Sequence, residues 1–174
     1  MKREKIAFLD RDGTINKDYP DNEWKYVKEP ELLTGTIKGL KLVQEYNYKI
    51  IIITNQYIIA DGIITLEQYK TFNEKLINIL KQNRIEILKV YCCSHNDLDN
   101  CNCKKPKTGM IDMALNDFEI DLSNSFYVGD NYSDYELAQK FNLDFYGIKG
   151  INSNNIFKYK SLYDVIIERE GNNK

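Results

Sequence analysis

Two aspartates, Asp10 and Asp12, follow a short apolar run that ends abruptly in charged residues. A carboxylate can attack phosphorus to form an acyl phosphate, while a second carboxylate two residues further on protonates the leaving oxygen and later activates water. Gly13 lets the backbone approach an anion closely, and the amides after Asp10 can form an anion-binding nest. The pattern therefore predicts phosphoryl chemistry, with Asp10 as nucleophile and Asp12 as general acid and base.

Side chains with complementary chemistry occur at three further places: Thr54 and Asn55 after a second apolar run, Lys104 and Lys105 after a loop rich in cysteine, and Asp130 and Asp134 after another apolar run. Carboxylate oxygens are the ligands that Mg²⁺ prefers, while a lysine and a hydroxyl supply charge and hydrogen bonds to a transferring phosphoryl group. Each short motif is common in turns when it occurs alone. Their combination in this chain order predicts a magnesium-dependent site for a small phosphorylated metabolite.

Four cysteines fall within twelve residues around the only histidine, His95. The pairs Cys93-x-His95 and Cys101-x-Cys103 supply three thiolates and one imidazole, which suit a closed tetrahedral zinc site. Cys92 could take the place of Cys93, but the Cys-x-His spacing favours Cys93. Because four protein ligands leave no position open for water, we predict a structural zinc in the loop 92–103, just before the two lysines.

The elements that must position these residues are predicted from apolar runs and helical periodicity. The β-branched run from Lys49 to Asn55 is typical of a central parallel strand that is covered on both faces. The predicted strands span residues 6–9, 49–55, 87–91, 125–128 and 143–147. The predicted helices span residues 36–46, 65–82, 109–118, 133–141 and 161–168. This alternation indicates one α/β domain over residues 1–174, a Rossmann-like doubly wound parallel sheet that binds ligands beyond the carboxyl ends of its strands.

Several motifs together resemble those of the haloacid dehalogenase superfamily: Asp10-Arg11-Asp12-Gly13-Thr14-Ile15-Asn16, Thr54-Asn55-Gln56, Lys105-Pro106 and Gly129-Asp130-x-x-x-Asp134. The resemblance extends to about residue 150. The Cys-x-His-x5-Cys-x-Cys loop is similar to that of one capless branch, which contains D-glycero-D-manno-heptose 1,7-bisphosphate phosphatases and histidinol-phosphate phosphatases. The resemblance implies a phosphatase without a large cap, with a phospho-aspartate intermediate.

The resemblance also implies a role for each motif residue. Thr54 would bind the phosphate, and Lys105 would steady both the phosphate and the attacking carboxylate. Mg²⁺ would be held by the Asp10 carboxylate, the backbone carbonyl of Asp12 and the Asp130 carboxylate, with Asp134 in support. Further substrate contacts are expected from Arg11, Asn55 and Lys104.

The chain departs from that branch beside the expected substrate. Lys104 stands where the branch usually has an arginine, so the charge is kept but the bidentate fork is lost. Tyr57 and Ile58 replace a Ser-Gly pair, and Asp61 replaces an arginine. These changes predict an altered substrate preference with unchanged chemistry. The sequence therefore leaves three kinds of substrate open: a sugar phosphate or bisphosphate, histidinol phosphate, or another phosphomonoester.

Charge and composition argue against several kinds of partner. Lys plus Arg (24) nearly balances Asp plus Glu (26), so no overall field favours nucleic acid or an anionic membrane. The apolar run near the N-terminus is far too short for a signal peptide or a membrane span. We expect a cytoplasmic monomer.

Two other classes of protein share part of this pattern. A response-regulator receiver domain also combines a parallel sheet with an acidic metal site, a threonine and a lysine, but its phosphoacceptor normally follows the third strand. A zinc-ribbon nucleic-acid module would need a basic face and a second ligand pair at ribbon spacing, and the sequence shows neither. Neither class would turn over a phosphomonoester.

Overall fold

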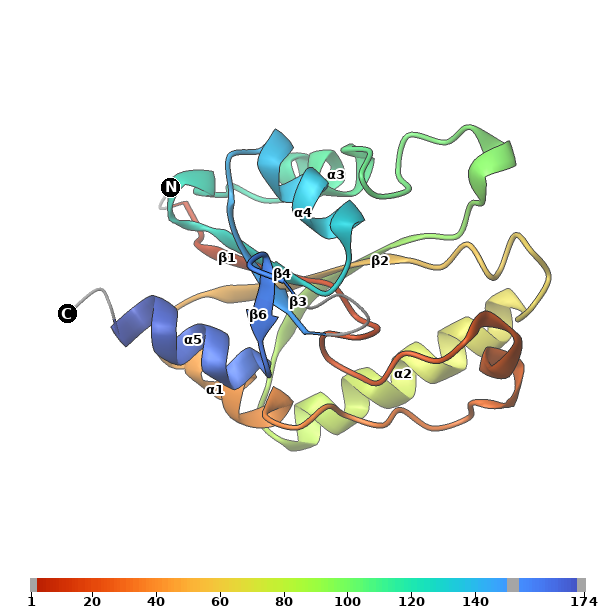
Figure 1. Ribbon diagram of the computed structural model, residues 1–174, viewed down its shortest axis with the longest axis horizontal. Helices are drawn as coiled ribbons and strands as arrows, with labels where there is room; N and C mark the ends of the chain where they lie inside the picture. The colour runs from red at the N-terminus through yellow and green to blue at the C-terminus, as the bar shows by residue number, and fades with distance from the viewer. Residues whose placement is uncertain (1–2, 150–153, 172–174) are drawn as a thin grey trace.

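The computed structural model describes residues 3–149 and 154–171, which form a six-stranded sheet between two layers of helices (Figure 1). The strand order is β3-β2-β1-β4-β5-β6, and all neighbouring strands are parallel. The strands are β1 Ile6–Leu9, β2 Lys49–Asn55, β3 Ile87–Cys93, β4 Phe126–Gly129, β5 Asp144–Ile148 and β6 Phe157–Tyr159. The predicted doubly wound parallel sheet is confirmed.

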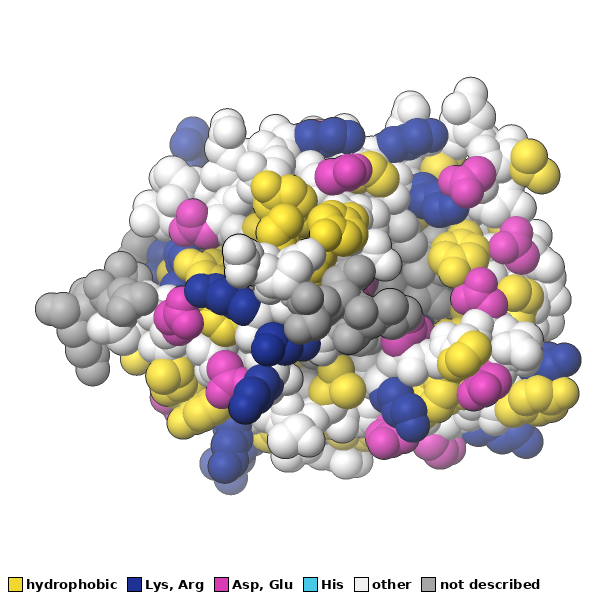
Figure 2. All heavy atoms as spheres, viewed as in Figure 1, with side chains coloured by type: hydrophobic (Ala, Val, Ile, Leu, Met, Phe, Trp, Pro, Cys, Tyr) yellow, Lys and Arg dark blue, Asp and Glu magenta, His cyan; other side chains and the backbone are white. Residues whose placement is uncertain are grey.

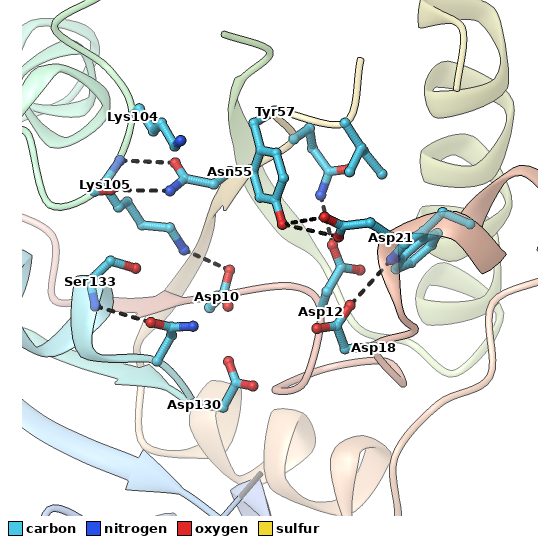
Figure 3. Close-up of a pocket in the computed structure, with 14 residues that line it drawn as sticks. Asp10, Asp12, Asp18, Asp21, Asn55, Tyr57, Lys104, Lys105, Asp130 and Ser133 are labelled. Carbon is cyan, nitrogen blue, oxygen red and sulfur yellow. Dashed lines mark hydrogen bonds and ion pairs between the residues drawn. The ribbon is translucent and has the colours of Figure 1, made fainter. Parts of the chain in front are cut away.

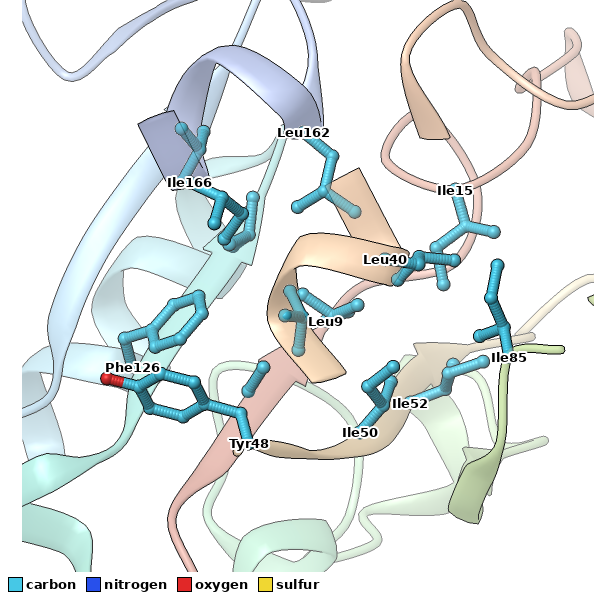
Figure 4. Close-up of a cluster of buried hydrophobic side chains, with 14 of the residues drawn as sticks. Leu9, Ile15, Leu40, Tyr48, Ile50, Ile52, Ile85, Phe126, Leu162 and Ile166 are labelled. Atoms are coloured by element: carbon cyan, nitrogen blue, oxygen red, sulfur yellow. The ribbon is translucent and has the colours of Figure 1, made fainter. Parts of the chain in front are cut away.

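Both faces of the central strands are apolar. Successive residues of a strand point to opposite faces, so Ala7 and Leu9 pack into one layer of the core while Ile6 and Phe8 pack into the other. The first layer is drawn in Figure 4, where side chains of the sheet pack against those of two helices, among them Leu40 and Leu162. Burial on both sides explains why these strands are uninterrupted hydrophobic runs in the sequence.

Helices cover each face of the sheet (Figure 1). One face is covered by α1 Thr36–Glu45, α2 Leu66–Gln82 and α5 Leu162–Gly171, and the other by α3 Gly109–Asp117 and α4 Tyr132–Lys140. The longest helix, α2, begins at a capping box in which the backbone N–H of Gln68 donates to Thr65 Oγ1 at 3.1 Å and that of Thr65 donates to Gln68 Oε1 at 2.8 Å. This cap satisfies two amides at the helix start.

The observed elements match the predicted ones within three residues at each end, and a few were not predicted. β3 runs on to Cys93, because its ladder with β2 continues until Cys93 lies opposite Asn55. The strand β6 and three short 3₁₀ helices, Asp21–Tyr26, Asp97–Asp99 and Leu122–Asn124, lie in segments that were expected to be irregular. Residues 150–153 of the expected polar stretch lie outside the described residues.

The order of the strands reverses between β1 and β4. From β1 the chain runs through β2 to β3 at one edge, and it then crosses to β4 on the other side of β1. Doubly wound sheets bind ligands at such a switch point, outside the carboxyl ends of the strands. Asp10 and Asp130 are the residues that directly follow β1 and β4.

Surface charge is mixed on the face drawn in Figure 2. Acidic and basic side chains are interspersed over much of it, and several basic side chains gather at its lower left. Among the described residues, no helix has the length and apolar character that crossing a membrane requires.

Candidate active site

Asp10, Lys105 and Asp134 form a buried ion-pair network at the carboxyl edge of the sheet. The Nζ atom of Lys105 donates to Asp10 Oδ1 and to Asp134 Oδ1, both at 2.7 Å, and to the carbonyl oxygen of Ile53 at 2.9 Å. An ammonium group has three donors, and these three acceptors use all of them. Lys105 therefore holds the Asp10 carboxylate in a fixed position.

Asp130 lies beside Asp10 because Gly13 leaves room for it. Gly13 has a φ of +81°, and a Cβ atom at this position would collide with the Asp130 carboxylate. Glycine alone adopts this conformation at no steric cost. One carboxylate oxygen from each of Asp10, Asp130 and Asp134 lies within 4.8 Å of the others. A donor set of this kind suits a hard divalent cation such as Mg²⁺.

Burial and neighbouring negative charge raise the pKa values of two of these carboxyl groups. Burial raises the pKa of Asp10 to about 7, with a further rise from Asp134 and an opposing effect of Lys105. Burial and then the Asp10 carboxylate raise the pKa of Asp130 to about 9. Burial favours the neutral form of Lys105, but Asp10 and Asp134 outweigh it and raise its pKa above the ordinary value. One ammonium does not offset the crowding of three carboxylates, so these residues fit a bound cation.

The Asp12 carboxylate accepts four hydrogen bonds. Arg11 donates from Nε to Oδ1 at 2.9 Å and from Nη2 to Oδ2 at 2.8 Å. Asn16 Nδ2 donates to Oδ1 at 2.9 Å, and Gln56 Nε2 donates to Oδ2 at 2.6 Å. The Arg11 side chain is buried in an apolar cluster and does not line the cavity described below, so the structure does not bring it to the site where a substrate contact was predicted.

Thr54 and Asn55 end β2 at the same edge, and their side chains bind protein groups. Thr54 is buried, its Oγ1 accepts from Gln56 Nε2 at 2.9 Å, and it does not line the cavity, so its contact with phosphate stays a prediction. The Asn55 amide accepts from the backbone N–H of Lys105 at 2.9 Å and donates to its carbonyl at 3.2 Å. Asn55 thus fastens the segment that carries Lys105 to β2.

A cavity of about 290 Å³ lies at this edge of the sheet (Figure 3). Six of the lining residues are sequence-predicted site residues: Asp10, Asp12, Asn55, Lys104, Lys105 and Asp130. The others are Asp18, Asp21, Trp24, Gln56, Tyr57, Ile58, Asn131 and Ser133. The sequence marks the loops after β1 and β2 as the parts that shape the substrate site, but the acidic Asp18 and Asp21 follow no period that would single them out.

Tyr57 lies at the edge of the cavity and joins two loops across it. Its hydroxyl donates to the Asp21 carboxylate, 3.0 Å from each oxygen. Burial and then Asp21 raise the pKa of Tyr57 to about 12, so this hydroxyl stays a donor near neutral pH. Lys104 Nζ lies 4.9 Å from the ring centroid of Tyr57 and 2.7 Å from Asp97 Oδ1. The tyrosine therefore bounds the cavity between Lys104 and Asp21.

A second cluster could hold a metal ion, formed by Cys93, His95, Cys101 and Cys103. His95 Nδ1 lies 3.6 Å from Cys93 Sγ and 3.2 Å from Cys103 Sγ. Cys93 Sγ lies 3.6 Å from Cys101 Sγ and 2.8 Å from Cys103 Sγ. Bonds of about 2.3 Å to sulfur and about 2.0 Å to nitrogen place ligands of a tetrahedral zinc roughly 3.5 to 3.8 Å apart. The cluster thus fits a zinc ion after a small expansion.

Cys92 lies outside this cluster, where its thiol shares a hydrogen bond with the hydroxyl of Tyr69. The geometry therefore favours Cys93 over Cys92 as the candidate ligand. Burial works against ionisation of Cys101, but backbone donors, first that of Lys104, lower the pKa of its thiol to about 7. A thiol that ionises near neutral pH is suited to bind a metal.

Comparison with known proteins identifies a family model, described as polynucleotide kinase 3 phosphatase, that matches residues 5–148. The chain is 41% identical over 145 residues to a Thermoplasma volcanium protein named "Probable D-glycero-D-manno-heptose-1,7-bisphosphate 7-phosphatase", covering 81% of this chain and 96% of that one. It is 37% identical over 143 residues to the D-glycero-alpha-D-manno-heptose-1,7-bisphosphate 7-phosphatase of Photorhabdus laumondii, covering 78% of this chain and 77% of that one.

A solved structure with the same fold is the D,D-heptose 1,7-bisphosphate phosphatase from B. bronchiseptica complexed with magnesium and phosphate. It matches with a TM-score of 0.82 at 22% identity, over 97% of this chain and 99% of that one.

Fold, site and relatives agree on one class of enzyme, the phosphoric monoester hydrolases of the haloacid dehalogenase type. Within that class the chain belongs to the polynucleotide kinase 3 phosphatase family. Membership confirms the resemblance seen in the motifs. It also argues against the receiver domain and the zinc ribbon, neither of which is a phosphatase.

Proposed function

We propose that this phosphatase hydrolyses a small phosphorylated sugar, such as D-glycero-D-manno-heptose 1,7-bisphosphate, through a phospho-aspartate at Asp10. The observation that carries the proposal is the Asp10 carboxylate, which Lys105 holds at 2.7 Å beside a cavity of about 290 Å³. A cavity of this size suits a metabolite. Relatives named for a heptose bisphosphate support a sugar phosphate as the substrate. The balanced charge of the chain argues against a polynucleotide as the substrate, although the family is described by one.

Asp10 and Asp12 divide the chemistry between them. An oxygen of Asp10 attacks phosphorus, the bond from phosphorus to the substrate oxygen breaks, and a proton from Asp12 passes to that leaving oxygen. Water then attacks phosphorus, Asp12 takes a proton from the water, and the bond between phosphorus and Asp10 breaks. Lys105 keeps Asp10 aligned throughout and adds positive charge beside the phosphoryl oxygens.

Two metal ions fit donor sets of the chain. Mg²⁺ would be held by Asp10, the backbone carbonyl of Asp12 and Asp130, with Asp134 supporting through Lys105. When bound it supplies positive charge that offsets the crowded carboxylates and the phosphate. Zn²⁺ would be held by Cys93, His95, Cys101 and Cys103, a closed set that leaves no position for chemistry and so has a structural role.

Thr54, Asn55 and Lys104 are proposed as the substrate contacts. Lys104 and Lys105 are the only basic residues among those that line the cavity in the described part of the chain. A second phosphate would therefore meet Lys104. The chain is further proposed to act as one domain and as a cytoplasmic monomer, and light scattering on a sizing column checks its oligomeric state.

A phosphate-release screen tests the substrate. It compares sugar monophosphates, sugar bisphosphates, histidinol phosphate, nucleotides and 3′-phosphorylated oligonucleotides, each with Asp10→Asn as the blank. We expect kcat/KM for the best sugar phosphate to exceed that for nucleotides and oligonucleotides by at least about 10-fold. Preference for an oligonucleotide would overturn the sugar assignment, and preference for histidinol phosphate would replace it by the alternative that the motifs left open.

The stability of the metal-free enzyme should fall as the pH rises. Asp10 and Asp130 have an ordinary pKa of 3.8 and folded-state values of about 7 and about 9. Above about pH 4 the folded chain therefore binds more protons than the unfolded chain, so the free energy of unfolding decreases with rising pH up to about 9. Since Mg²⁺ competes with these protons, it should raise the melting temperature more near pH 8.5 than near pH 6.

Thermal melts with and without Mg²⁺ at the two pH values check this expectation. Asp130→Asn should lose most of the shift that Mg²⁺ produces. An equal shift at both pH values, or a full shift in Asp130→Asn, would contradict the proposed magnesium site.

Tyr57 should limit the size of the substrate. Tyr57→Ser removes the ring beside Lys104 and the hydroxyl that donates to Asp21, and we expect kcat/KM for bulky phosphomonoesters to rise by about 10-fold relative to small ones. Tyr57→Phe is the matched control, because it keeps the ring and loses only the hydroxyl. Steady-state kinetics on a size series of phosphomonoesters measure the ratio. If the serine and phenylalanine variants have the same ratio as wild type, the ring does not restrict the site.

A further inference from the structure

The side chain of Arg11 is buried in a box of three aromatic rings. Its Cζ atom lies 4.9 Å from the ring centroid of Phe72, 5.3 Å from that of Tyr69 and 5.8 Å from that of Trp24. Phe72 and Tyr69 belong to α2, and Trp24 belongs to the 3₁₀ helix after β1. Arg11 is only 1% exposed. Burying a cation is costly unless it is paired, so this arrangement needs a strong partner.

That partner is the carboxylate of Asp12. Arg11 uses two parallel donors, Nε and Nη2, on the two carboxylate oxygens at 2.9 and 2.8 Å. Such a fork fixes the plane of the carboxylate as well as its position. A lysine at the same place would give a point charge without this control of direction.

The other two partners of Asp12 differ from Arg11 in one respect. Asn16 and Gln56 each donate one amide hydrogen to Asp12, and the amide oxygen of each is buried without a hydrogen-bond partner. Each of these amide nitrogens also donates to a second acceptor, Asn16 to the carbonyl of Lys17 and Gln56 to Thr54 Oγ1, both at 2.9 Å. Only the guanidinium of Arg11 gives Asp12 two donors and a positive charge. Arg11 is therefore the strongest support of the Asp12 carboxylate.

We propose that Arg11 is a positioning residue, whose fork, fixed by the aromatic box, aims the Asp12 carboxylate at the cavity for both proton transfers. The inference rests on the proposed function, in which Asp12 gives a proton to the leaving oxygen and later takes one from water. Arg11 itself touches neither the substrate nor the reacting atoms. Its removal should therefore reproduce, in weaker form, the loss of Asp12.

The test compares two substrates with different leaving groups in Arg11→Met. Methionine fills an aromatic box well but removes the fork. An alkyl phosphate needs a proton on its leaving oxygen, so its turnover should fall by about 100-fold. The p-nitrophenolate of p-nitrophenyl phosphate leaves without that proton, so the first turnover of this substrate should stay fast while later turnovers slow down. Rapid acid quench should then find phosphate accumulated on Asp10. Arg84→Met changes an exposed arginine and is the matched control, so the turnover of both substrates should stay at the wild-type level.

Two further variants make the result decisive. Adding Arg11→Met to Asp12→Asn should cost less than about 2-fold more, because coupled residues are not additive. Arg11→Lys keeps the charge in the box, serves if the methionine variant does not fold, and should show the same pattern more weakly. Equal loss on both substrates without a phosphoenzyme, or full additivity with Asp12→Asn, would overturn the positioning role. Absence of turnover by the wild-type enzyme would overturn the proposed function instead.

Discussion

Asp10→Asn is expected to abolish phosphate release, with kcat at least about 10⁴-fold lower, because an amide cannot attack phosphorus to form the acyl phosphate. The variant should fold at least as stably as the wild type without metal. The change removes one of three crowded carboxylates, and the amide oxygen of asparagine can still accept from Lys105. Phosphate release and urea unfolding, measured on the same preparation, test both expectations.

A surface change provides the control for this experiment. Asp112→Asn alters the same residue type at an exposed position of α3 and should leave activity and stability within error. Acid quench of the wild type during turnover should yield phosphate on Asp10, and the asparagine variant should yield none. If Asp10→Asn kept more than about a tenth of the wild-type rate, with mass spectrometry excluding deamidation to aspartate, covalent catalysis by Asp10 would be ruled out.

The fold was predictable where burial is symmetrical. β1 and β2 are covered on both faces, so their apolar runs stand out at full length. β3 was predicted two residues short, because its last residues, Cys92 and Cys93, were assigned to the Cys/His loop, although both still pair with β2. β6 has only three residues, with Lys158 exposed between two buried aromatic residues, and so short an alternation does not differ from a loop.

The site was predictable only where the sheet itself assembles it. Parallel strands end at one edge, so Asp10 and Asp130 could be brought together from the ends of their strands, and Lys105 from its place after the Cys/His loop. The burial of Arg11 could not be predicted, because an arginine between two aspartates is normally exposed, and the rings that bury it come from α2 and a 3₁₀ helix elsewhere in the chain. Asp21 and Tyr57 meet across two irregular loops, whose relative position no local pattern encodes.

The second large effect is expected at the Cys/His cluster. Cys101→Ser should lose the metal of this cluster and lower the melting temperature by about 10 °C. A site that binds zinc about 1,000 times more tightly than the free zinc concentration adds roughly 4 kcal/mol, and 1 kcal/mol shifts a chain of this size by about 2–4 °C. Cys92→Ser is the matched control, since Cys92 is adjacent to Cys93 but lies outside the cluster. Elemental analysis and thermal melts measure both effects.

Loss of the metal from the Cys/His cluster should also slow catalysis, because it should disturb the position of Lys105. The backbone N–H of Lys104 donates to Cys101 Sγ at 3.4 Å, and Lys107 Nζ donates to the carbonyl of Cys101 at 2.6 Å, so the segment that carries Lys105 rests directly on the cluster. Chelation followed by Mg²⁺ alone should therefore leave the enzyme slow, whereas Zn²⁺ with Mg²⁺ should restore it. Full recovery with Mg²⁺ alone, or equal losses in Cys92→Ser and Cys101→Ser, would contradict a structural zinc that positions Lys105.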